Sequence, residues 1–255
     1  MNLAATGLRV LVTAGAAGIG RAIAQTFVDN GALVHVCDVD EHALAALPAK
    51  ITKTRTDVAN LTDIDRLFED VARHLGGLDV LVNNAGIAGP TAKVEDIKPQ
   101  EWDRCLAVDL NGMFYCTHKA MPLIKAAGGG SIINLSSAAG LHGFPQRSPY
   151  CAAKWGVVGF TKSLAVEAGP DKVRVNCICP GIVEGERIDR VVDAKAKSLG
   201  VSREVFLEKF LETTSMRSTV SAQEIANMAL FLASNEGRHI TGQALAVDAG
   251  VRYLV

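Results

Sequence analysis

Tyr150 and Lys154 stand four residues apart, and the residues between them, Cys151-Ala152-Ala153, contain no helix breaker. Residues at this spacing share one face of an α-helix, so a phenol and an ammonium can lie side by side. A free phenol has a pKa of about 10, and a neighbouring cation favours its ionised form. The pair therefore predicts a general acid–base group tuned by a lysine. A half-buried tyrosine beside a lysine with no chemical role is the alternative that this pair alone leaves open.

A glycine-rich turn near the start of the chain predicts a phosphate-binding site. The apolar run 8–13 leads into this turn, and a helical pattern follows it. Glycines let the backbone approach a ligand closely, and a helix N-terminus offers N–H groups and positive potential to a pyrophosphate. The residues expected to contact the cofactor here are Gly15, Gly18, Ile19 and Gly20.

Asp38 ends the next apolar run, 33–38, and predicts which dinucleotide binds. A carboxylate at this place can accept hydrogen bonds from the adenosine ribose hydroxyls and would repel a 2′-phosphate. Neither the glycine-rich turn nor the residues directly after Asp38 contain Arg or Lys. The cofactor is therefore predicted to be NAD rather than NADP. An exposed acid at a strand end is the alternative interpretation of Asp38.

Apolar strands alternate with amphipathic helices along most of the chain. The expected strands are 8–13, 33–38, 78–83, 131–136, 173–179 and 244–248, and the expected helices are 21–30, 62–75, 99–125, 150–168, 202–212 and 222–234. Strands that are apolar on both faces are typical of a parallel sheet covered by helices on each side. The order predicts one α/β domain over residues 1–255, a doubly wound Rossmann-type fold.

Segment 182–221 is more charged and less regular than the rest, and it follows a strand end. Open α/β sheets bind ligands at the carboxyl ends of their strands. We therefore expect this segment to be a lid or substrate loop, with a solvated surface excursion as the alternative.

Composition and charge argue against several classes of protein. The net charge is −1, with acids and bases mixed, so no basic surface for nucleic acid is expected. The apolar runs are short, which predicts no membrane span, and the first residues lack the order of a signal peptide. Six cysteines without a Cys-x-x-Cys motif favour buried thiols in a reducing, cytoplasmic setting. His142 and His239 have no second ligand at helical spacing, so no metal site is predicted.

Taken together, these residues resemble the short-chain dehydrogenase/reductase family in its single-domain form. The resemblance spans nearly the whole chain and rests on the joint order of several motifs. These are segment 13–20, Asp57-Val58, Asn83-Asn84-Ala85-Gly86, Asn111, Ser137, Tyr150 with Lys154, and segment 176–181.

The resemblance implies four catalytic residues. Tyr150 would exchange a proton with the substrate, and Ser137 would polarise the substrate oxygen, with its neighbour Ser136 the less favoured choice. Lys154 would tune Tyr150 and bind the nicotinamide ribose. Asn111 would position a water that links Lys154 to solvent. The resemblance also implies cofactor contacts from Asp57, Val58, Asn83, Gly86, Pro180, Gly181 and Val183.

Three positions depart from the family pattern. Ala14 stands where a glycine is usual after Thr13, and Ala249 replaces a glycine in an Asp-Gly-Gly sequence near the C-terminus. Segment 182–187 lacks the threonine that often touches the cofactor. The turn keeps enough glycine, so we expect cofactor binding to survive the change at Ala14. The contact that the threonine would make stays open, and Ala249 is expected to change the packing only slightly.

The expected substrate is polar, such as a sugar, a polyol or a hydroxy acid, because polar residues flank the site. These substrate-binding candidates are His142, Gln146, Arg147 and Arg187. An arginine could hold an anionic group by paired hydrogen bonds, but ion pairs of the lid arginines with Glu184, Glu186 and Asp189 are equally open.

The sequence thus predicts an NAD-dependent dehydrogenase that interconverts a secondary alcohol and a carbonyl. The alternatives are a 3-oxoacyl-type or other carbonyl reductase, an epimerase or dehydratase that recycles its cofactor, and a non-catalytic dinucleotide-binding protein. The family resemblance implies a homotetramer assembled through segments 99–125 and 150–168, and the apolar tail 251–255 is consistent with burial against another subunit.

Overall fold

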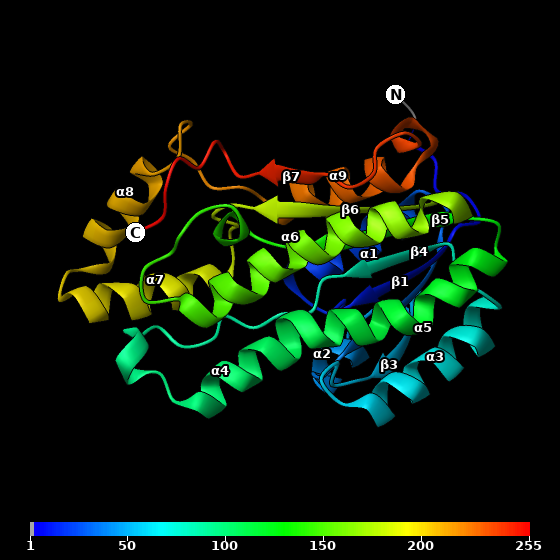
Figure 1. The fold of residues 1–255 in the computed structure, drawn as a ribbon, viewed down its shortest axis with the longest axis horizontal. Helices are drawn as coiled ribbons and strands as arrows, with labels where there is room; N and C mark the ends of the chain where they lie inside the picture. Colours follow the sequence, from blue (N-terminus) through cyan, green and yellow to red (C-terminus); the bar gives the residue numbers. More distant parts are fainter. Residues whose placement is uncertain (1–2) are drawn as a thin grey trace.

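A computed structural model describes residues 3–255, and its centre is a seven-stranded sheet (Figure 1). All neighbouring strands are parallel, in the order β3-β2-β1-β4-β5-β6-β7. The strands are β1 Arg9–Thr13, β2 Leu33–Asp38, β3 Thr52–Arg55, β4 Val80–Asn83, β5 Gly130–Leu135, β6 Val173–Pro180 and β7 Ala244–Val247. This arrangement confirms the predicted doubly wound Rossmann-type α/β fold.

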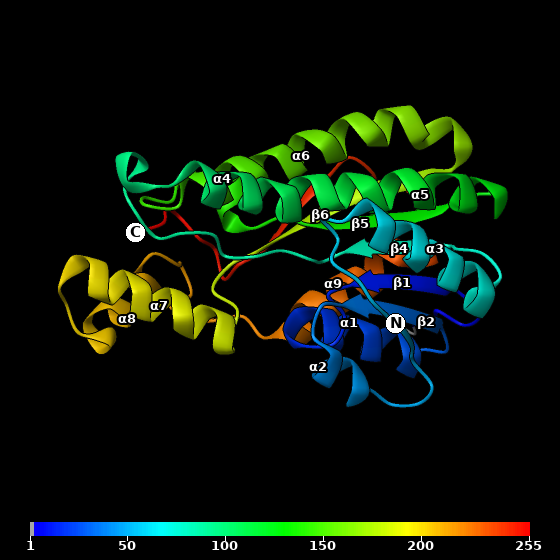
Figure 2. The ribbon, with the colours of Figure 1, turned by 90° about the horizontal axis from the view of Figure 1, so that it is seen from below.

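Helices cover both faces of the sheet, as the view from below shows (Figure 2). The helices are α1 Gly18–Asp29, α2 Glu41–Ala45, α3 Leu61–Leu75, α4 Pro99–Leu106, α5 Gly112–Ala126, α6 Ser148–Ala168, α7 Glu186–Leu199, α8 Arg203–Glu212 and α9 Ala222–Ala233. On β1, Val10 and Val12 face the layer of α1, α2 and α9, whereas Leu11 faces the layer of α3, α5 and α6. Each central strand is therefore buried on both sides, which is why apolar residues occupy consecutive positions in it, such as Val10, Leu11 and Val12.

Local signals set the helix ends in several places. Asn60 caps α3, because its side chain accepts hydrogen bonds from the amides of Thr62 and Asp63. Gly76 ends the same helix in the left-handed region, with φ at 68°. The expected helix 99–125 is present as one continuous helical run, in which α4 passes into α5 through a π-helical turn, Ala107–Asn111.

The segment expected to be irregular contains two helices, α7 and α8, which stand at the carboxyl end of the sheet (Figures 1 and 2). Only α8 was expected. The sequence does not predict α7, because charged residues occupy half of its positions and its buried stripe is short. That stripe consists of Val191, Val192, Lys195 and Ala196.

The C-terminal tail packs against this region within the same chain. Val251 and Leu254 are buried in a cluster with Phe206 and Phe210 of α8. The expectation that another subunit covers the tail is therefore corrected for these two side chains, although Tyr253 is exposed.

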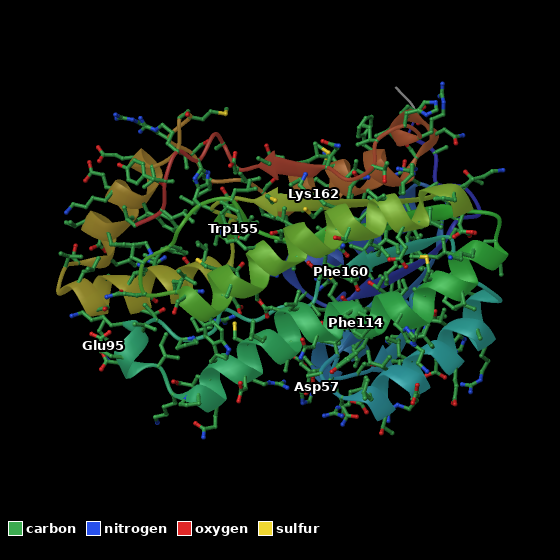
Figure 3. The ribbon with its side chains drawn as sticks, in the orientation of Figure 1. Asp57, Glu95, Phe114, Trp155, Phe160 and Lys162 are labelled. Carbon is green, nitrogen blue, oxygen red and sulfur yellow. The ribbon has the colours of Figure 1, made fainter. Side chains whose placement is uncertain are left out.

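The other sequence-level expectations concern cysteines and surfaces. All six cysteines lie within the described residues and are free, and Cys151 alone is partly exposed. Among residues 3–255, no helix combines the length and apolar character needed to cross a bilayer. Phe114 on α5 and Trp155 on α6 are about half exposed, at 48% and 51%, on the outer helical face in Figure 3.

Candidate active site

A cavity of about 700 Å³ opens at the carboxyl edge of the sheet. It extends from the glycine-rich turn, past the start of α6, to the inner side of α7. Its wall includes Ile19, Asp38, Gly86, Ser137, Tyr150, Lys154, Pro180, Gly181, Val183, Arg147, Arg187 and Leu254. The topology thus brings together the two ends of the predicted site, which are more than 100 residues apart in the chain.

The glycine-rich end fits a dinucleotide phosphate. Helix α1 begins at Gly18, and no described side chain caps its first turn, so its free N–H groups remain available. A Cβ atom at Gly20 would lie 2.1 Å from the Ala14 carbonyl oxygen, and one at Gly15 would lie 2.7 Å from the Val36 side chain. These glycines allow a close turn that any larger residue would disrupt.

Asp38 is fixed at the wall beside this turn. Its Oδ2 accepts a hydrogen bond from the Ala16 amide at 3.1 Å, and its Oδ1 accepts one from the Asp40 amide at 3.2 Å. A dinucleotide would be held by this carboxylate and by the N-terminus of α1. The residues present therefore fit a nicotinamide dinucleotide.

Ala14 and Ala249 have backbone conformations that favour glycine. Their φ angles are 49° and 57°, in the left-handed region. Both are positions where the family pattern led us to expect a glycine. The chain therefore keeps the usual backbone path here with a residue that is less suited to it.

Tyr150 and Lys154 lie side by side on the first turns of α6, as the spacing predicts. Lys154 Nζ lies 5.6 Å from the centre of the Tyr150 ring and donates a hydrogen bond to the Leu135 carbonyl at 3.0 Å. Lys154 is only 3% exposed, whereas Tyr150 is partly exposed at the cavity wall. The phenol can therefore meet a substrate, while the ammonium acts from behind it.

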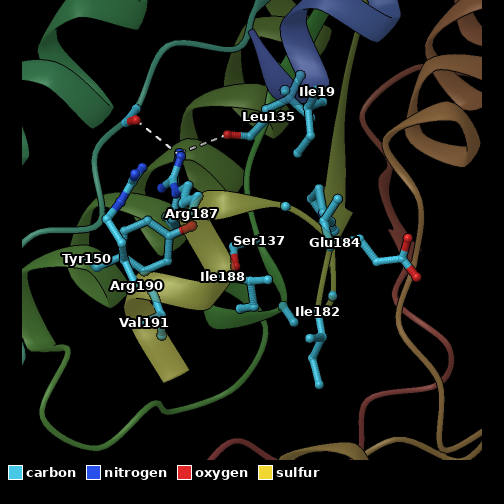
Figure 4. Close-up of a pocket in the computed structure, with 18 of the residues that line it drawn as sticks. Ile19, Leu135, Ser137, Tyr150, Ile182, Glu184, Arg187, Ile188, Arg190 and Val191 are labelled. Atoms are coloured by element: carbon cyan, nitrogen blue, oxygen red, sulfur yellow. Dashed lines mark hydrogen bonds between the residues drawn. The ribbon is translucent and has the colours of Figure 1, made fainter. Parts of the chain in front are cut away.

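Two serines follow β5, and they differ in what their hydroxyls can do. The Ser136 hydroxyl donates to the Lys154 carbonyl at 2.9 Å, so its proton is committed. The Ser137 hydroxyl accepts a hydrogen bond from the Ala139 amide at 3.1 Å, so its own proton is free to donate. Ser137 is therefore the better donor to a substrate oxygen, and Figure 4 shows it at the cavity wall near Tyr150.

Asn111, the expected water-positioning residue, lies outside the site. Its side chain is exposed at the end of the π turn. Asp109, two residues earlier, is buried with its Oδ2 atom 3.7 Å from Lys154 Nζ. Side chains two positions apart on a helix point in different directions, and a π turn changes which of them faces inward. The residue beside Lys154 is therefore Asp109, which corrects the expectation for Asn111.

Asn84 lines the cavity in place of Asn83, which was the expected cofactor contact. The Asn83 side chain is buried and donates to Thr117 Oγ1 at 3.0 Å and to Asn134 Oδ1 at 2.9 Å. Asn84 instead lines the cavity, where its Nδ2 donates to the carbonyls of Thr13 and Ala14. Successive residues at a strand end face opposite sides, and the sequence does not show which one faces the ligand.

Asp57 and Val58 lie beyond the cavity wall. Asp57 Oδ2 accepts a hydrogen bond from Arg104 at 3.0 Å. Val58 is buried against the backbone of Gly112, where a Cβ atom would lie 2.7 Å from the valine side chain. Their contact with an adenine ring stays a prediction.

The four substrate-binding candidates divide into two pairs. His142 and Gln146 do not line the cavity, and the Gln146 side chain accepts a hydrogen bond from Ser198 at 3.2 Å. Arg147 and Arg187 do line it, with their guanidinium carbons 5.3 and 5.7 Å from the centre of the Tyr150 ring. Of the four candidates, therefore, only the two arginines lie beside Tyr150.

Arg147 is an unusual member of this group because it is only 2% exposed. Its Nη2 donates to the Ala88 carbonyl, but Nε and Nη1 have no partner among the described residues. Burial lowers the pKa of the Arg147 guanidinium from its usual range, and the neighbouring Arg187 lowers it further. An anion at this place would relieve both effects.

Comparison with known proteins supports one family for the whole chain. A family model described as Enoyl-(Acyl carrier protein) reductase matches residues 14–252. Trans-4-hydroxycyclohexanecarboxylate dehydrogenase of Sinomonas cyclohexanicum is 40% identical over 94% of this chain and 91% of its own length. D-beta-hydroxybutyrate dehydrogenase of Rhizobium meliloti (strain 1021) is 33% identical over 94% of this chain and 96% of its own.

A 3-oxoacyl-[acyl-carrier-protein] reductase of Thermotoga maritima is 34% identical, over 94% of this chain and 96% of its own. The crystal structure of levodione reductase has a TM-score of 0.90 and 28% identity, and the match covers 96% of this chain and 97% of that one. The chain therefore belongs to the short-chain dehydrogenase/reductase family, and it is an oxidoreductase that acts on CH–OH groups with a nicotinamide dinucleotide, NAD or NADP.

Proposed function

We propose that the protein is an NAD-dependent dehydrogenase for the secondary alcohol of a hydroxy carboxylic acid. One observation carries this proposal. Arg147 and Arg187 flank the Tyr150 ring, and neither pairs with a carboxylate among residues 3–255. The acids nearby are engaged elsewhere: Glu186 pairs with Arg190 on α7, and Asp189 and Asp193 pair with Arg203. The two cations at Tyr150 therefore lack a counter-charge that a substrate carboxylate would supply.

The rest of the substrate wall favours a hydrocarbon body over a sugar or polyol. Apolar side chains from the lid, from α8 and from the tail surround the polar centre, as Figure 4 shows in part. They are Ile182, Ile188, Val191, Phe210 and Leu254. Each hydroxyl of a sugar that faced these five side chains would need a hydrogen-bond partner that they do not offer. Two relatives carry names of hydroxy acid dehydrogenases, acting on D-beta-hydroxybutyrate and trans-4-hydroxycyclohexanecarboxylate, which supports the same class.

The residues around the cavity suggest how the reaction proceeds. Tyr150 accepts the proton of the substrate hydroxyl, because Lys154 behind it favours the phenolate. Ser137 donates a hydrogen bond to the oxygen on which charge develops. Arg147 and Arg187 orient the carboxylate so that the carbinol faces the cofactor. The nicotinamide, when bound, supplies the hydride acceptor.

Asp38 supports the choice of NAD in this proposal. Two backbone amides orient its carboxylate at the wall beside α1, and a 2′-phosphate there would face a negative charge. We expect kcat/KM with NAD to exceed that with NADP, and Asp38→Ser to reduce the ratio. A preference for NADP in the unaltered protein would refute this role, and it would favour the alternative of a biosynthetic carbonyl reductase.

Matched substrates test the carboxylate directly. For each hydroxy acid in a panel, its kcat/KM is compared with that of the methyl ester, which loses the charge and adds one methyl group. Arg147→Met and Arg187→Met should each lower the acid-to-ester ratio by roughly 10- to 100-fold, the value of a charge-assisted hydrogen bond. Arg203→Ala, whose partners are carboxylates on α7, is the control and should leave the ratio unchanged. An equal acid-to-ester ratio in the wild type and in all three variants would refute the proposal of an anionic substrate.

Tyr150→Phe tests the acid–base group. It should abolish turnover and leave NADH binding, measured by fluorescence titration, nearly intact. Turnover that persists would remove Tyr150 from the mechanism.

We also propose that the protein is a cytoplasmic homotetramer, with no nucleic-acid or membrane partner. The half-exposed Phe114 and Trp155 on the outer face of α5 and α6 support assembly through these helices. Light scattering after size exclusion measures the mass, and Trp155→Glu should lower it. A monomer at micromolar concentration would refute the assembly.

A further inference from the structure

Asp109 and Lys154 form a buried pair directly behind Tyr150. The side chains of Lys154 and Asp109 are 4% and 0% exposed, and Lys154 Nζ lies 3.7 Å from Asp109 Oδ2. The Ile87 amide donates to Asp109 Oδ1 at 2.6 Å, whereas Oδ2 has no hydrogen-bond partner among the residues described. One oxygen is therefore fixed by the backbone, and the other is directed at the ammonium.

The backbone covers this pair on two sides, while Lys154 also borders the cavity. Asp109 belongs to the π turn between α4 and α5. A Cβ atom added to Gly86 would lie 3.2 Å from Lys154 Nζ and 3.4 Å from Asp109 Oδ2, so the peptide at Gly86 covers the pair. Because the Asp109 side chain is 0% exposed, water screens its charge less than it would screen a surface carboxylate, and the effect of that charge on neighbouring groups is larger.

The other charged groups facing Tyr150 are cations or lie in solvent. Arg147, Arg187 and Lys154 all lie within 6 Å of the ring centre. The thiol of Cys105 on α4 is neutral, because burial raises its pKa to about 11. The carboxylates of the cavity wall are Asp38, Glu184 and Glu186; the last two are exposed, and Asp38 is partly exposed and held by backbone amides. Asp109 is therefore the buried carboxylate nearest to this group of cations among residues 3–255.

We propose that Asp109 is a positioning residue that sets the pH range of catalysis by opposing the effect of Lys154 on Tyr150. This inference rests on the proposed acid–base role of Tyr150, but it does not depend on which alcohol is the substrate. The Asp109 carboxylate holds the ammonium in place through the 3.7 Å contact. Its negative charge also partly cancels the field that favours the phenolate. The enzyme thus reaches full oxidative activity at a higher pH than it would with an uncharged residue at position 109.

The structure gives a size for this effect. The two distances of 3.7 and 5.6 Å place the carboxylate within about 9 Å of the Tyr150 ring centre. With an effective dielectric constant of about 20, one charge at that distance changes a proton equilibrium by about one pH unit. Asp109→Asn keeps the shape and the acceptor for the Ile87 amide, and it removes only the charge.

The experiment measures kcat/KM for alcohol oxidation from neutral to alkaline pH. In Asp109→Asn, the midpoint of the rising limb should move to lower pH by about one unit. Asp103→Asn is the control: it removes an exposed acid from α4 and should leave the profile where it is. Asp109→Ser, which also lacks the charge, carries the same expectation if the asparagine variant does not fold.

A second measurement needs no substrate and so separates this inference from the proposed function. Tyrosinate absorbance is titrated in the protein with and without Tyr150→Phe, and the difference isolates Tyr150. The same acid shift should appear when Asp109→Asn is introduced. An unchanged or alkaline-shifted midpoint in either measurement would overturn the proposal, because Asp109 would then be uncharged or without influence on Tyr150.

Discussion

Ala14→Gly is predicted to stabilise the protein, although it removes a methyl group. Ala14 has φ at 49°, in the left-handed region, where a side chain meets the following carbonyl. This conformation costs about 1–2 kcal/mol for an L-residue with a Cβ atom. Glycine removes that cost, but it adds about 0.4–1 kcal/mol of chain entropy to the unfolded state. The expected net gain is about 0.5 kcal/mol.

Equilibrium unfolding in urea measures this gain, and thermal unfolding gives a second value. For a chain of this size, 0.5 kcal/mol corresponds to about 1–2 °C in Tm. Ala249→Gly, where φ is 57°, should behave in the same way. The double variant should approach the sum of the two changes if the sites are independent.

Ala22→Gly provides the matched control because it makes the same chemical change inside α1. There the glycine should destabilise by about 1 kcal/mol, its usual cost in a helix. If Ala14→Gly and Ala22→Gly lowered stability alike, the left-handed strain at Ala14 would not be the controlling effect.

Three further predictions follow from local geometry and ionisation. Gly20→Ala should abolish NAD binding by calorimetry, because its Cβ would lie 2.1 Å from the Ala14 carbonyl; binding at the original affinity would contradict the close turn. Burial lowers the pKa of His35 to about 4, so the unfolded state binds the extra proton, and the unfolding free energy should fall as pH drops from about 6.5 to 4. His35→Gln should lose this slope, which amounts to about 3 kcal/mol at most. Burial and Arg147 lower the pKa of Lys195 to about 8, so this residue should add stability as pH rises from about 8 to its ordinary value of 10.5. The difference between wild type and Lys195→Met should show that rise, and a flat difference would contradict it.

The fold could be predicted from the sequence because the strands are buried on both faces and the glycines mark the helix ends. Strand 33–38 has the predicted bounds, and α6 begins only two residues before its predicted start. Helix α7 could not be predicted as easily, because its helical signal is a narrow buried stripe among charges. The short strand β3 consists of four polar residues, Thr-Lys-Thr-Arg. Because it has no apolar run, the sequence does not predict it.

In the site, too, the sequence predicts some side-chain positions and not others. The spacing of Tyr150 and Lys154 specifies a shared helix face, and the structure places them together. The sequence does not show that Asp109, rather than Asn111, lies beside Lys154. The π turn determines which side chain faces inward, and the residue types do not predict such a turn. Arg147 has no carboxylate partner because nearby acids pair with other arginines: Glu186 with Arg190 and Asp189 with Arg203. The sequence does not show these pairings, because they form only when the helices pack.

Because Leu254 belongs to the substrate wall, the two ends of the cavity are completed at different times during synthesis of the chain. The glycine-rich turn, which ends at Gly20, precedes Leu254, at the other end of the cavity, by more than 230 residues along the chain. Chains grow from the N-terminus at about 5–20 residues per second. The nucleotide-binding end is therefore synthesised many seconds before the substrate end can close, and a nascent chain could contact its cofactor before it can recognise an alcohol.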